Sequence, residues 1–262
     1  MRNFPQEIGF LFPAPICLDG RVRFLCGILL LLTISCERKA APRIVRTAPM
    51  DPPAYWVWHR SSPLTPQEIS HLQAAGTKSL YWQAVECGWK DRKWQPVRIA
   101  GPMPESPGLR FVPVFRIKPD AAFLQEPAAA PQFARMIQLW ADEKELPEIQ
   151  IDFDCPDRLL ARYAEFLASL GAALAPTKIS ITALASWPRH SQFKQLASSV
   201  SSMAPMFYDL HADQATDVKS SRFHPIANEA DVEFIRLWTD CPVPWLAGLP
   251  NFERLSLFKE DG

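Results

Sequence analysis

The residues best suited to chemistry lie in one short stretch, Gln150-Ile151-Asp152-Phe153-Asp154-Cys155-Pro156. Side chains of a strand alternate between its two faces, so Asp152 and Asp154 share one face while Ile151 and Phe153 share the other. The two carboxylates are then about 7 Å apart, which is twice the rise per residue. Because burying an unpaired carboxylate is costly, this face requires a cation, a metal or a substrate as its partner. The pattern indicates either an acid/base pair at the mouth of a barrel or a strand end that is salt-bridged to a neighbour.

Arg116 bears on that choice, because alternation along a strand over 109–117 places it on the same face as Val112 and Val114. We expect it beside the acidic strand, where it pairs with Asp152 or Asp154 and lowers the pKa of that carboxyl. A general acid needs the opposite, since it must be protonated at the working pH. An ionised Asp152 and apolar surroundings would raise the pKa of Asp154. Both interpretations stay open.

The elements that must position these residues alternate between strand and helix, which predicts a parallel sheet with crossover helices. We predict strands over 54–59, 79–86, 109–117, 148–154, 178–186, 203–210 and 243–249. We predict helices over 65–76, 131–144, 157–174, 193–200 and 232–238. The first helix begins with a capping box made by Thr65 and Glu68, with Pro66 at the first helical position. The predicted fold is therefore α/β, a (β/α)8-type TIM barrel that is incomplete, with about seven strands and the eighth missing.

Chemistry in such barrels lies at the carboxyl ends of the strands. The predicted ends carry acids, an arginine and aromatic residues, a combination typical of a sugar site: His59, Glu86, Arg116, Asp154, Trp187, Tyr208 and Asp209. No glycine-rich phosphate loop follows the first strand, which disfavours nucleotide binding. Lys+Arg and Asp+Glu both number 28, so no basic excess points to nucleic acid.

No metal and no other cofactor is predicted, because no His, Cys, Asp or Glu cluster has the spacing of metal ligands. Cys87, Cys155 and Cys241 are too far apart in sequence for a zinc ribbon or a Cys-x-x-Cys redox pair. We expect three buried thiols, with one disulfide plus an odd thiol as the alternative.

The amino-terminal segment has the features of a secretory signal. Arg21 and Arg23 precede an apolar run over 24–32, which is shorter than the roughly 20 residues that span a bilayer. The next four residues, Thr33-Ile34-Ser35-Cys36, resemble the lipobox of bacterial lipoproteins, in which Cys36 would carry the lipid. An ordinary signal and a buried helix are the alternatives.

These features predict three regions and a location. Residues 1–36 form the signal segment, 37–52 a charged, proline-containing tether, and 53–262 the barrel domain. The expected location is the bacterial cell envelope, with the chain lipid-anchored at the outer membrane and facing the periplasm. A secreted or periplasmic protein is the alternative.

Three motifs, in chain order, resemble family 18 glycoside hydrolases, the chitinase-like barrels. Residues 150–156 resemble the family's Asp-x-Asp-x-Glu strand, with Asp154 where the general acid Glu stands. Residues 206–209, Met-Phe-Tyr-Asp, match the sixth-strand Met-x-Tyr-Asp, and residues 248–250 match a Gly-(Leu/Ile)-Pro turn. From Tyr55 onward the chain also resembles an uncharacterised bacterial lipoprotein family, domain of unknown function 3142, thought to share that barrel clan.

The resemblance implies hydrolysis of an amino-sugar polysaccharide, with the substrate's own acetamido group as nucleophile. Asp154 would be the general acid beside Asp152, and Tyr208 and Asp209 would orient the acetamido group. The implied substrate-binding residues are Glu86, Arg116, Trp82, Trp187 and Trp245.

The chain also departs from the chitinase-like pattern. Asp154 is one methylene shorter than Glu, Gln150 replaces the first acid of the motif, and the family's Ser-x-Gly-Gly strand is absent. Two hypotheses follow. One is an envelope glycosidase, and the other is a catalytically inactive barrel that binds glycans or serves envelope assembly. Both have a polysaccharide or oligosaccharide and, through the lipid, a membrane as partners.

Overall fold

The computed structural model describes residues 52–100, 104–142, 144–211, 214–220, 225–228 and 231–251. The predicted signal segment, Cys36 and all but the last residue of the tether lie outside these ranges. The strands are β1 Ala54–Val57, β2 Ser79–Lys90, β3 Lys93–Ile99, β4 Arg110–Ile117, β5 Glu148–Asp152, β6 Lys178–Leu184 and β7 Ser202–Met206. The helices are α1 Pro66–Ala74, α2 Ala129–Ala141, α3 Leu160–Leu174, α4 Phe193–Ala197, α5 Ala215–Lys219 and α6 Val232–Leu237. Short 3-10 turns occupy Ala122–Gln125, Asp157–Leu159 and Trp187–Arg189.

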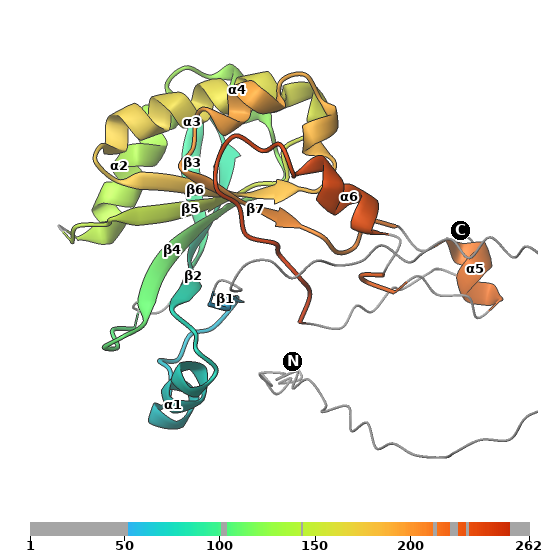
Figure 1. The fold of residues 1–262 in the computed structure, drawn as a ribbon. Coiled ribbons are helices and arrows are strands. Elements are labelled where there is room, and N and C mark those ends of the chain that lie inside the picture. The colour runs from blue at the N-terminus through green and yellow to red at the C-terminus, as the bar shows by residue number, and fades with distance from the viewer. Residues whose placement is uncertain are drawn as a thin grey trace, which may run out of the picture. The chain divides into compact units, whose positions relative to one another are not determined.

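One curled sheet organises the domain (Figure 1). Its order is β1-β2-β4-β5-β6-β7, and each of these strands runs parallel to the next. Parallel bridges from Met203 to Trp245 and from Met206 to Gly248 add a seventh position. Gly248 suits this place because a Cβ there would lie 3.1 Å from the Pro205 carbonyl oxygen. The prediction of an incomplete parallel barrel of about seven strands is confirmed.

The curl of the sheet is visible in a hydrogen bond across its inner face. The indole N–H of Trp56 on β1 donates to the side-chain oxygen of Gln150 on β5. In a flat sheet these strands would be three spacings apart, about 14 Å, so the bond indicates that the sheet bends inward. Among the described residues no strand pairing joins β1 to the bridge segment 245–248, and the wall is therefore a half-barrel.

The β2–β3 hairpin was not predicted. The second strand was expected to end at residue 86, yet β2 continues to Lys90 and turns back through Asp91 and Arg92, with φ of 52° and 59°. Two residues with positive φ make the tight turn that suits a hairpin. Asp-Arg lacks the usual glycine, and Pro96 interrupts β3, so the sequence pattern of a hairpin is weak here.

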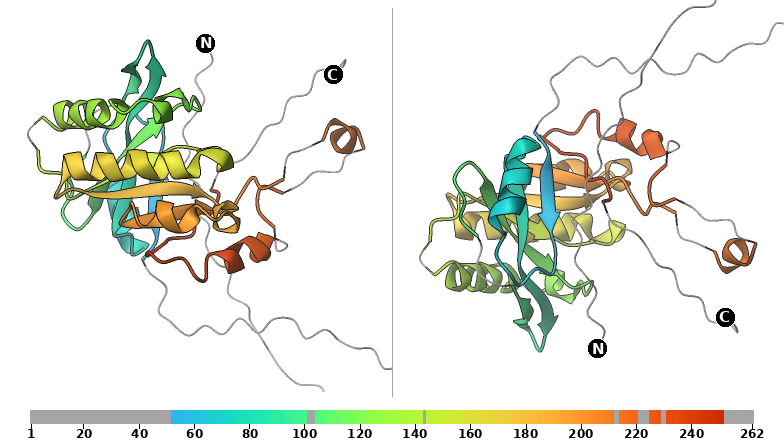
Figure 2. Two further views of the ribbon diagram at one scale, coloured as in Figure 1. Left: turned by 90° about the horizontal axis from the view of Figure 1, so that it is seen from above. Right: turned by 90° about the horizontal axis from the view of Figure 1, so that it is seen from below.

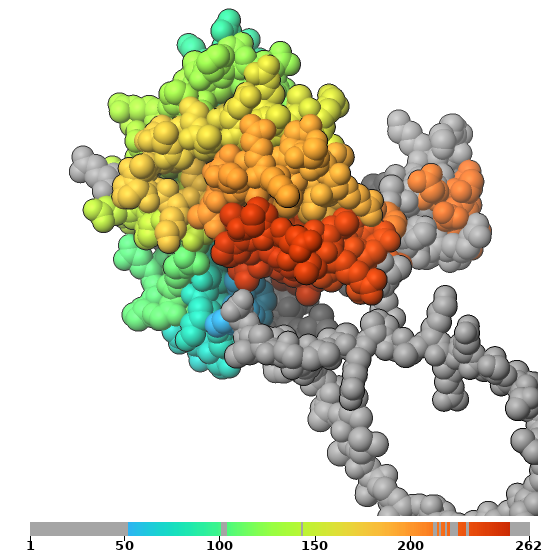
Figure 3. Space-filling view, turned by 45° about the horizontal axis from the view of Figure 1, so that its top comes forward, coloured from blue at the N-terminus to red at the C-terminus, as the bar shows by residue number. Residues whose placement is uncertain are grey.

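The outer face of the sheet is covered by helices. Figures 1 and 2 show α2, α3 and α4 side by side over it, and Figure 3 shows residues 231–251, in red, packed along the α4 and β7 region. Alternation sends one set of strand side chains into this layer, which is apolar and rich in aromatic rings. Its fully buried members include Phe115, Phe123, Phe133, Ile149, Ile151, Phe153, Tyr163 and Leu167.

Helix α1 begins as the sequence predicted. Thr65 accepts from the Glu68 backbone, and the Glu68 side chain accepts in return from the Thr65 backbone N–H. Arg60 also binds Glu68 at 2.7 Å, and this hydrogen bond is the main reason why the pKa of Glu68 falls to about 2. The ion pair between Arg60 and Glu68 therefore ties α1 to the loop after β1.

Two further observations concern the predictions about cysteines and membranes. Cys87 and Cys155 are buried, Cys241 is half-buried, and none of the three forms a disulfide. Burial raises the pKa of Cys87 and of Cys155 to about 12, so both remain thiols at neutral pH. In the described part of the chain no helix is both long and apolar enough to cross a membrane.

Candidate functional site

The inner face of the half-barrel carries the polar side chains. Gln150 and Asp152 on β5 alternate with the apolar residues that face the helices, and Ser180 and Thr182 do the same on β6. All four are 6% exposed or less, so water does not satisfy them and each needs a partner within the fold. Ser180 donates to the Ile149 carbonyl at 3.2 Å.

Asp152 is held by two of its neighbours. The Thr182 hydroxyl donates to one carboxylate oxygen at 2.7 Å, and an Arg116 guanidinium nitrogen lies 3.6 Å from the other. Burial nevertheless raises the pKa of Asp152, outweighing the lowering by Thr182 and Arg116, and Asp154 raises it further. The predicted ion pair with Arg116 therefore exists and lowers the pKa of Asp152, as expected, but desolvation is stronger than this attraction, so the net shift of the pKa is upward.

Asp154 stands two residues beyond, just past the end of β5, with its side chain exposed. Tyr208 follows β7, and its pKa rises to about 12, chiefly through burial and then through the charges of Asp152 and Asp154. Tyr208 is therefore a protonated hydrogen-bond donor at neutral pH. The structure thus brings together Asp152, Asp154, Tyr208 and Arg116 at the carboxyl ends of three strands. Asp209, the next residue, is exposed and has a φ of 56°.

A row of alternating charges crosses the sheet beside this group. Arg98 on β3 is in register with Glu86 on β2, Glu86 with Arg116 on β4, and Arg116 with Asp152 on β5. In-register residues of neighbouring strands point to the same face, so the four charges line one edge of the site. Trp58 supports the row, since the Arg116 guanidinium lies 5.6 Å from its ring centroid.

His59 connects β1 to this row. Its ring Nδ1 lies 3.0 Å from an Arg98 nitrogen, and its backbone N–H donates to the Gln83 side-chain oxygen at 2.8 Å. Burial, followed by Arg98, lowers the pKa of His59, so the imidazole is neutral at pH 7 and can accept from Arg98. Its φ of 55° is uncommon for a residue other than glycine.

The sequence profile of the family described as "Domain of unknown function (DUF3142)" matches residues 108–253, which is more than half of the chain. The chain belongs to the DUF3142 family. The matched region of this DUF3142 protein contains Arg116, Asp152, Asp154, Thr182 and Tyr208. It leaves out β1, β2 and β3.

Solved structures similar to the DUF3142 protein include three bacterial proteins. A chitinase from Bacteroides thetaiotaomicron is 14% identical with a TM-score of 0.48, over 63% of this chain and 55% of that one. The spore cortex-lytic enzyme SleL of Bacillus cereus is 16% identical with a TM-score of 0.47, over 74% and 48%. A putative sporulation-specific glycosylase, ydhD of Bacillus subtilis, is 16% identical with a TM-score of 0.43, over 55% and 53%. The chain thus spans about half the length of these structures, and no curated protein matches its sequence.

Two predicted substrate-binding residues of the DUF3142 protein are core residues. Trp82 is 1% exposed on the outer side of β2, against α1, and Trp187 is 0% exposed against Tyr163. Trp245 is half-buried and also packs into the outer core, beside Phe207 and Trp238. Residue type alone did not reveal which face each tryptophan takes, so assigning Trp82 and Trp187 to the substrate site was wrong. Glu86 and Arg116, in contrast, do lie on the inner face.

Three residues of the DUF3142 protein's site were missed in the sequence. Arg98 was missed because β3 was not predicted. Thr182 and Gln83 could have been found by extending the alternation of the predicted strands, which puts both on the inner face. Gln83 is 2% exposed, and its side-chain nitrogen has no hydrogen-bond partner among the described residues. The described residues contain no group of three His, Cys, Asp or Glu side chains that could hold a metal ion.

Proposed function

We propose that this DUF3142 protein is a cell-envelope lipoprotein that hydrolyses an amino-sugar polysaccharide by acid catalysis on the inner face of its half-barrel. One observation carries the proposal: an exposed carboxylate, Asp154, lies beside a buried carboxyl with a raised pKa, Asp152, and a protonated phenol, Tyr208. Perturbed groups that converge at the carboxyl end of a parallel sheet are characteristic of active sites.

The proposal assigns each group a role. Asp154 is accessible to a substrate, and in its protonated form it donates a proton to the glycosidic oxygen as the bond to the anomeric carbon breaks. The substrate's acetamido oxygen attacks that carbon and forms an oxazolinium ion, so no second carboxylate has to be the nucleophile. A water molecule then attacks the same carbon and opens the ring, and Asp154 takes a proton from this water, which restores the acid. Tyr208 donates a hydrogen bond to the acetamido group. Arg116 and Thr182 hold Asp152 in place behind it.

The cell-envelope part of the proposal rests on residues 21–36, a charged and then apolar segment that ends in a lipobox-like Cys36. Labelling of the expressed protein with a radioactive fatty acid tests it, with Cys36→Ser as the matched variant. Label that persists in Cys36→Ser would contradict lipidation at this residue.

A second candidate is a glycan-binding protein without catalysis. It is favoured by the ion pair between Arg116 and Asp152 and by the short side chain at position 154, because a misplacement of about 1 Å can cost roughly 100-fold in rate. On this reading the same inner face binds the polysaccharide and leaves it intact.

Asp154→Asn separates the two candidates. Chitin oligosaccharides and purified peptidoglycan strands are offered to the wild type and the variant, with reducing ends measured for turnover and calorimetry for binding. The proposal predicts turnover by the wild type, a loss of about 100-fold or more in Asp154→Asn, and unchanged binding. Asp142→Asn is the matched control, because Asp142 is an exposed residue at the carboxyl end of α2. This variant should retain full activity. Binding without turnover by the wild type would favour the second candidate.

A further inference from the structure

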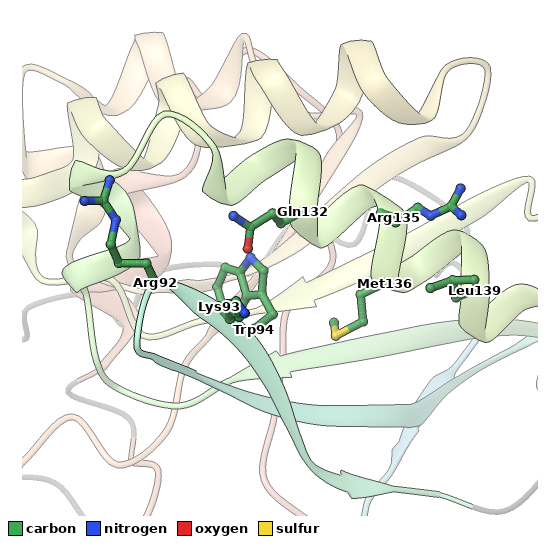
Figure 4. Close-up of a pocket in the computed structure, with 7 residues that line it drawn as sticks. All are labelled: Arg92, Lys93, Trp94, Gln132, Arg135, Met136 and Leu139. Atoms are coloured by element: carbon green, nitrogen blue, oxygen red, sulfur yellow. The ribbon is translucent and has the colours of Figure 1, made fainter.

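A groove lies between β3 and α2, on the side of the sheet that the helices cover (Figure 4). Its volume is about 420 Å³, and it is lined by Arg92, Lys93, Trp94, Gln132, Arg135, Met136 and Leu139. This volume lies within the range of about 300–1,000 Å³ that is usual for ligand sites. Nothing in the proposed hydrolysis uses this groove.

Helix α2 supplies the groove with a second stripe of side chains. Gln132, Arg135, Met136 and Leu139 are spaced i, i+3, i+4 and i+7, so they share one face of the helix. The stripe that contains Phe133 is buried in the core instead. Leu139 is 66% exposed, which leaves an apolar side chain of the groove in contact with water.

The rim of the groove is cationic. Arg92, Lys93 and Arg135 all line it, and no carboxylate is among the seven lining residues. Arg92 also pairs with Glu126, so Lys93 and Arg135 carry the excess of positive charge. The whole chain has equal numbers of basic and acidic residues, which makes this excess a local feature. A ligand with negative charge at its ends and an apolar centre complements the groove.

The aromatic residue of the groove argues for a peptide over a sugar. Sugars stack on an exposed aromatic face, but the Trp94 ring packs 4.6 Å from the Phe133 centroid and 4.9 Å from that of Phe123. Its indole N–H is also used, since it donates to the Ala129 carbonyl at 2.8 Å. Met136 and Leu139 offer flexible apolar contacts, which suit an inserted aliphatic side chain.

We propose that this groove binds an acidic peptide segment of a partner protein. An aliphatic side chain of the segment enters between Met136 and Leu139, while carboxylates on either side of it pair with Arg135 and Lys93. The groove is thus a docking site that recruits a partner, and it is independent of whether the inner face hydrolyses glycans.

Fluorescence anisotropy with the full chain tests the proposal. The probe is a fluorescein-labelled octapeptide of sequence Gly-Glu-Glu-Leu-Leu-Glu-Glu-Gly, compared with one peptide that has Lys for each Glu and another that has Ser for each Leu. We expect saturable binding of the first peptide only, weakened about tenfold by Arg135→Glu and by Lys93→Glu. Binding should also weaken when ionic strength rises from 0.05 to 0.5 M, as the Debye length shortens to a few Å.

Arg162→Glu on α3 is the matched control, because Arg162 is an exposed helix arginine outside the groove. The proposal is overturned if the wild type shows no saturable binding of the acidic peptide, or if Arg162→Glu weakens binding as much as Arg135→Glu. It is also overturned if the lysine or serine peptide binds equally well. Binding to phosphatidylglycerol vesicles that depends on Arg135, without peptide binding, would assign the groove to a lipid surface.

Discussion

Both faces of strand β5 are buried, but one is apolar and the other is polar. Ile151 on the outer face and Phe153, which directly follows the strand on the same side, are at most 1% exposed, and Asp152 on the inner face is 6% exposed. The Phe153 ring meets Phe123 of the 3-10 turn and Tyr163 of α3, whereas Asp152 meets a hydroxyl and a guanidinium. The outer layer therefore stabilises the fold by burying apolar surface, and the inner layer has to recover the cost of burying polar groups.

This difference shows how one five-residue strand serves two purposes. Because side chains alternate, the residues that hold the sheet against the helices and the residues that form the site are neighbours in sequence but share no contacts across the strand. A change on one face should therefore leave the other largely intact. Four substitutions test this separation, in order of decreasing expected effect on stability.

Phe153→Ala should have the largest effect. It removes a fully buried ring that meets Phe123 and Tyr163 edge to face, and such truncations cost about 3–5 kcal/mol. Urea denaturation monitored by circular dichroism measures the loss. Asp154→Asn, one residue away on the other face, should change the free energy of unfolding by less than about 0.5 kcal/mol. Similar losses of unfolding free energy in Phe153→Ala and Asp154→Asn would show that the two faces do not act separately.

Thr182→Val should come next. The valine keeps the shape of the side chain but leaves Asp152 without its hydroxyl donor, and an unsatisfied buried group costs about 1–3 kcal/mol. The same denaturation at pH 7 measures it. Ser201→Val is the comparison, since the Ser201 hydroxyl donates to a carbonyl, that of Ile179, and not to a carboxylate. If Thr182→Val leaves the free energy of unfolding unchanged, the inner layer does not depend on this hydrogen bond.

Asp152→Asn should have an effect that depends on pH. Because the folded-state pKa of Asp152 is raised, its protonated form stabilises the fold at low pH, and this contribution is lost as pH rises through the folded pKa. The wild type should therefore lose stability relative to Asp152→Asn between pH 4 and pH 7. Chemical denaturation at several pH values measures the difference. A wild type that gains stability relative to Asp152→Asn as pH rises would show that Arg116 and Thr182 outweigh burial.

Arg98→Gln should have the smallest effect on stability, below about 0.5 kcal/mol, because Arg98 is exposed on β3. The substitution removes one charge of the row and the contact between Arg98 and His59. After burial, the charge of Arg98 is the next cause that lowers the pKa of His59. We therefore expect the His59 pKa to rise in the variant, as measured by NMR titration. An unchanged His59 pKa would mean that the row is not electrostatically coupled.

The sequence predicted the parallel order well, because alternation of strands and helices leaves few topologies open. The capping box at Thr65 and the shared face of Asp152 and Arg116 follow from equally local rules. What it did not predict depends on contacts between distant segments. The direction of the Asp152 pKa shift required knowing how deeply the carboxyl is buried, and β3 formed despite Pro96 because β2 offered it a partner edge.

The tryptophans were placed on the wrong face for a different reason. Trp82 and Gln83 are adjacent, so only one of them can face the inside of the half-barrel, and the prediction chose the aromatic residue for its chemistry. The structure puts Gln83 inside, since Trp82 fills the space beneath α1. Alternation along the strand puts Gln83 on the same face as Tyr81 and Trp82 on the opposite face. It does not say which of the two faces is the inner one, because that depends on the volume that α1 leaves free.

Among the described strands, β3 differs from the others because it pairs antiparallel with its neighbour, β2. β3 follows β2 through a two-residue turn and pairs with it antiparallel, so no crossover helix is needed to bring β3 to the sheet. The β2–β3 hairpin also lies outside the region that the DUF3142 profile matches, while Asp152 and Asp154 lie inside it. Arg98 thus reaches the edge of the site from an antiparallel strand, whereas Asp152 and Arg116 reach it from the parallel strands β5 and β4.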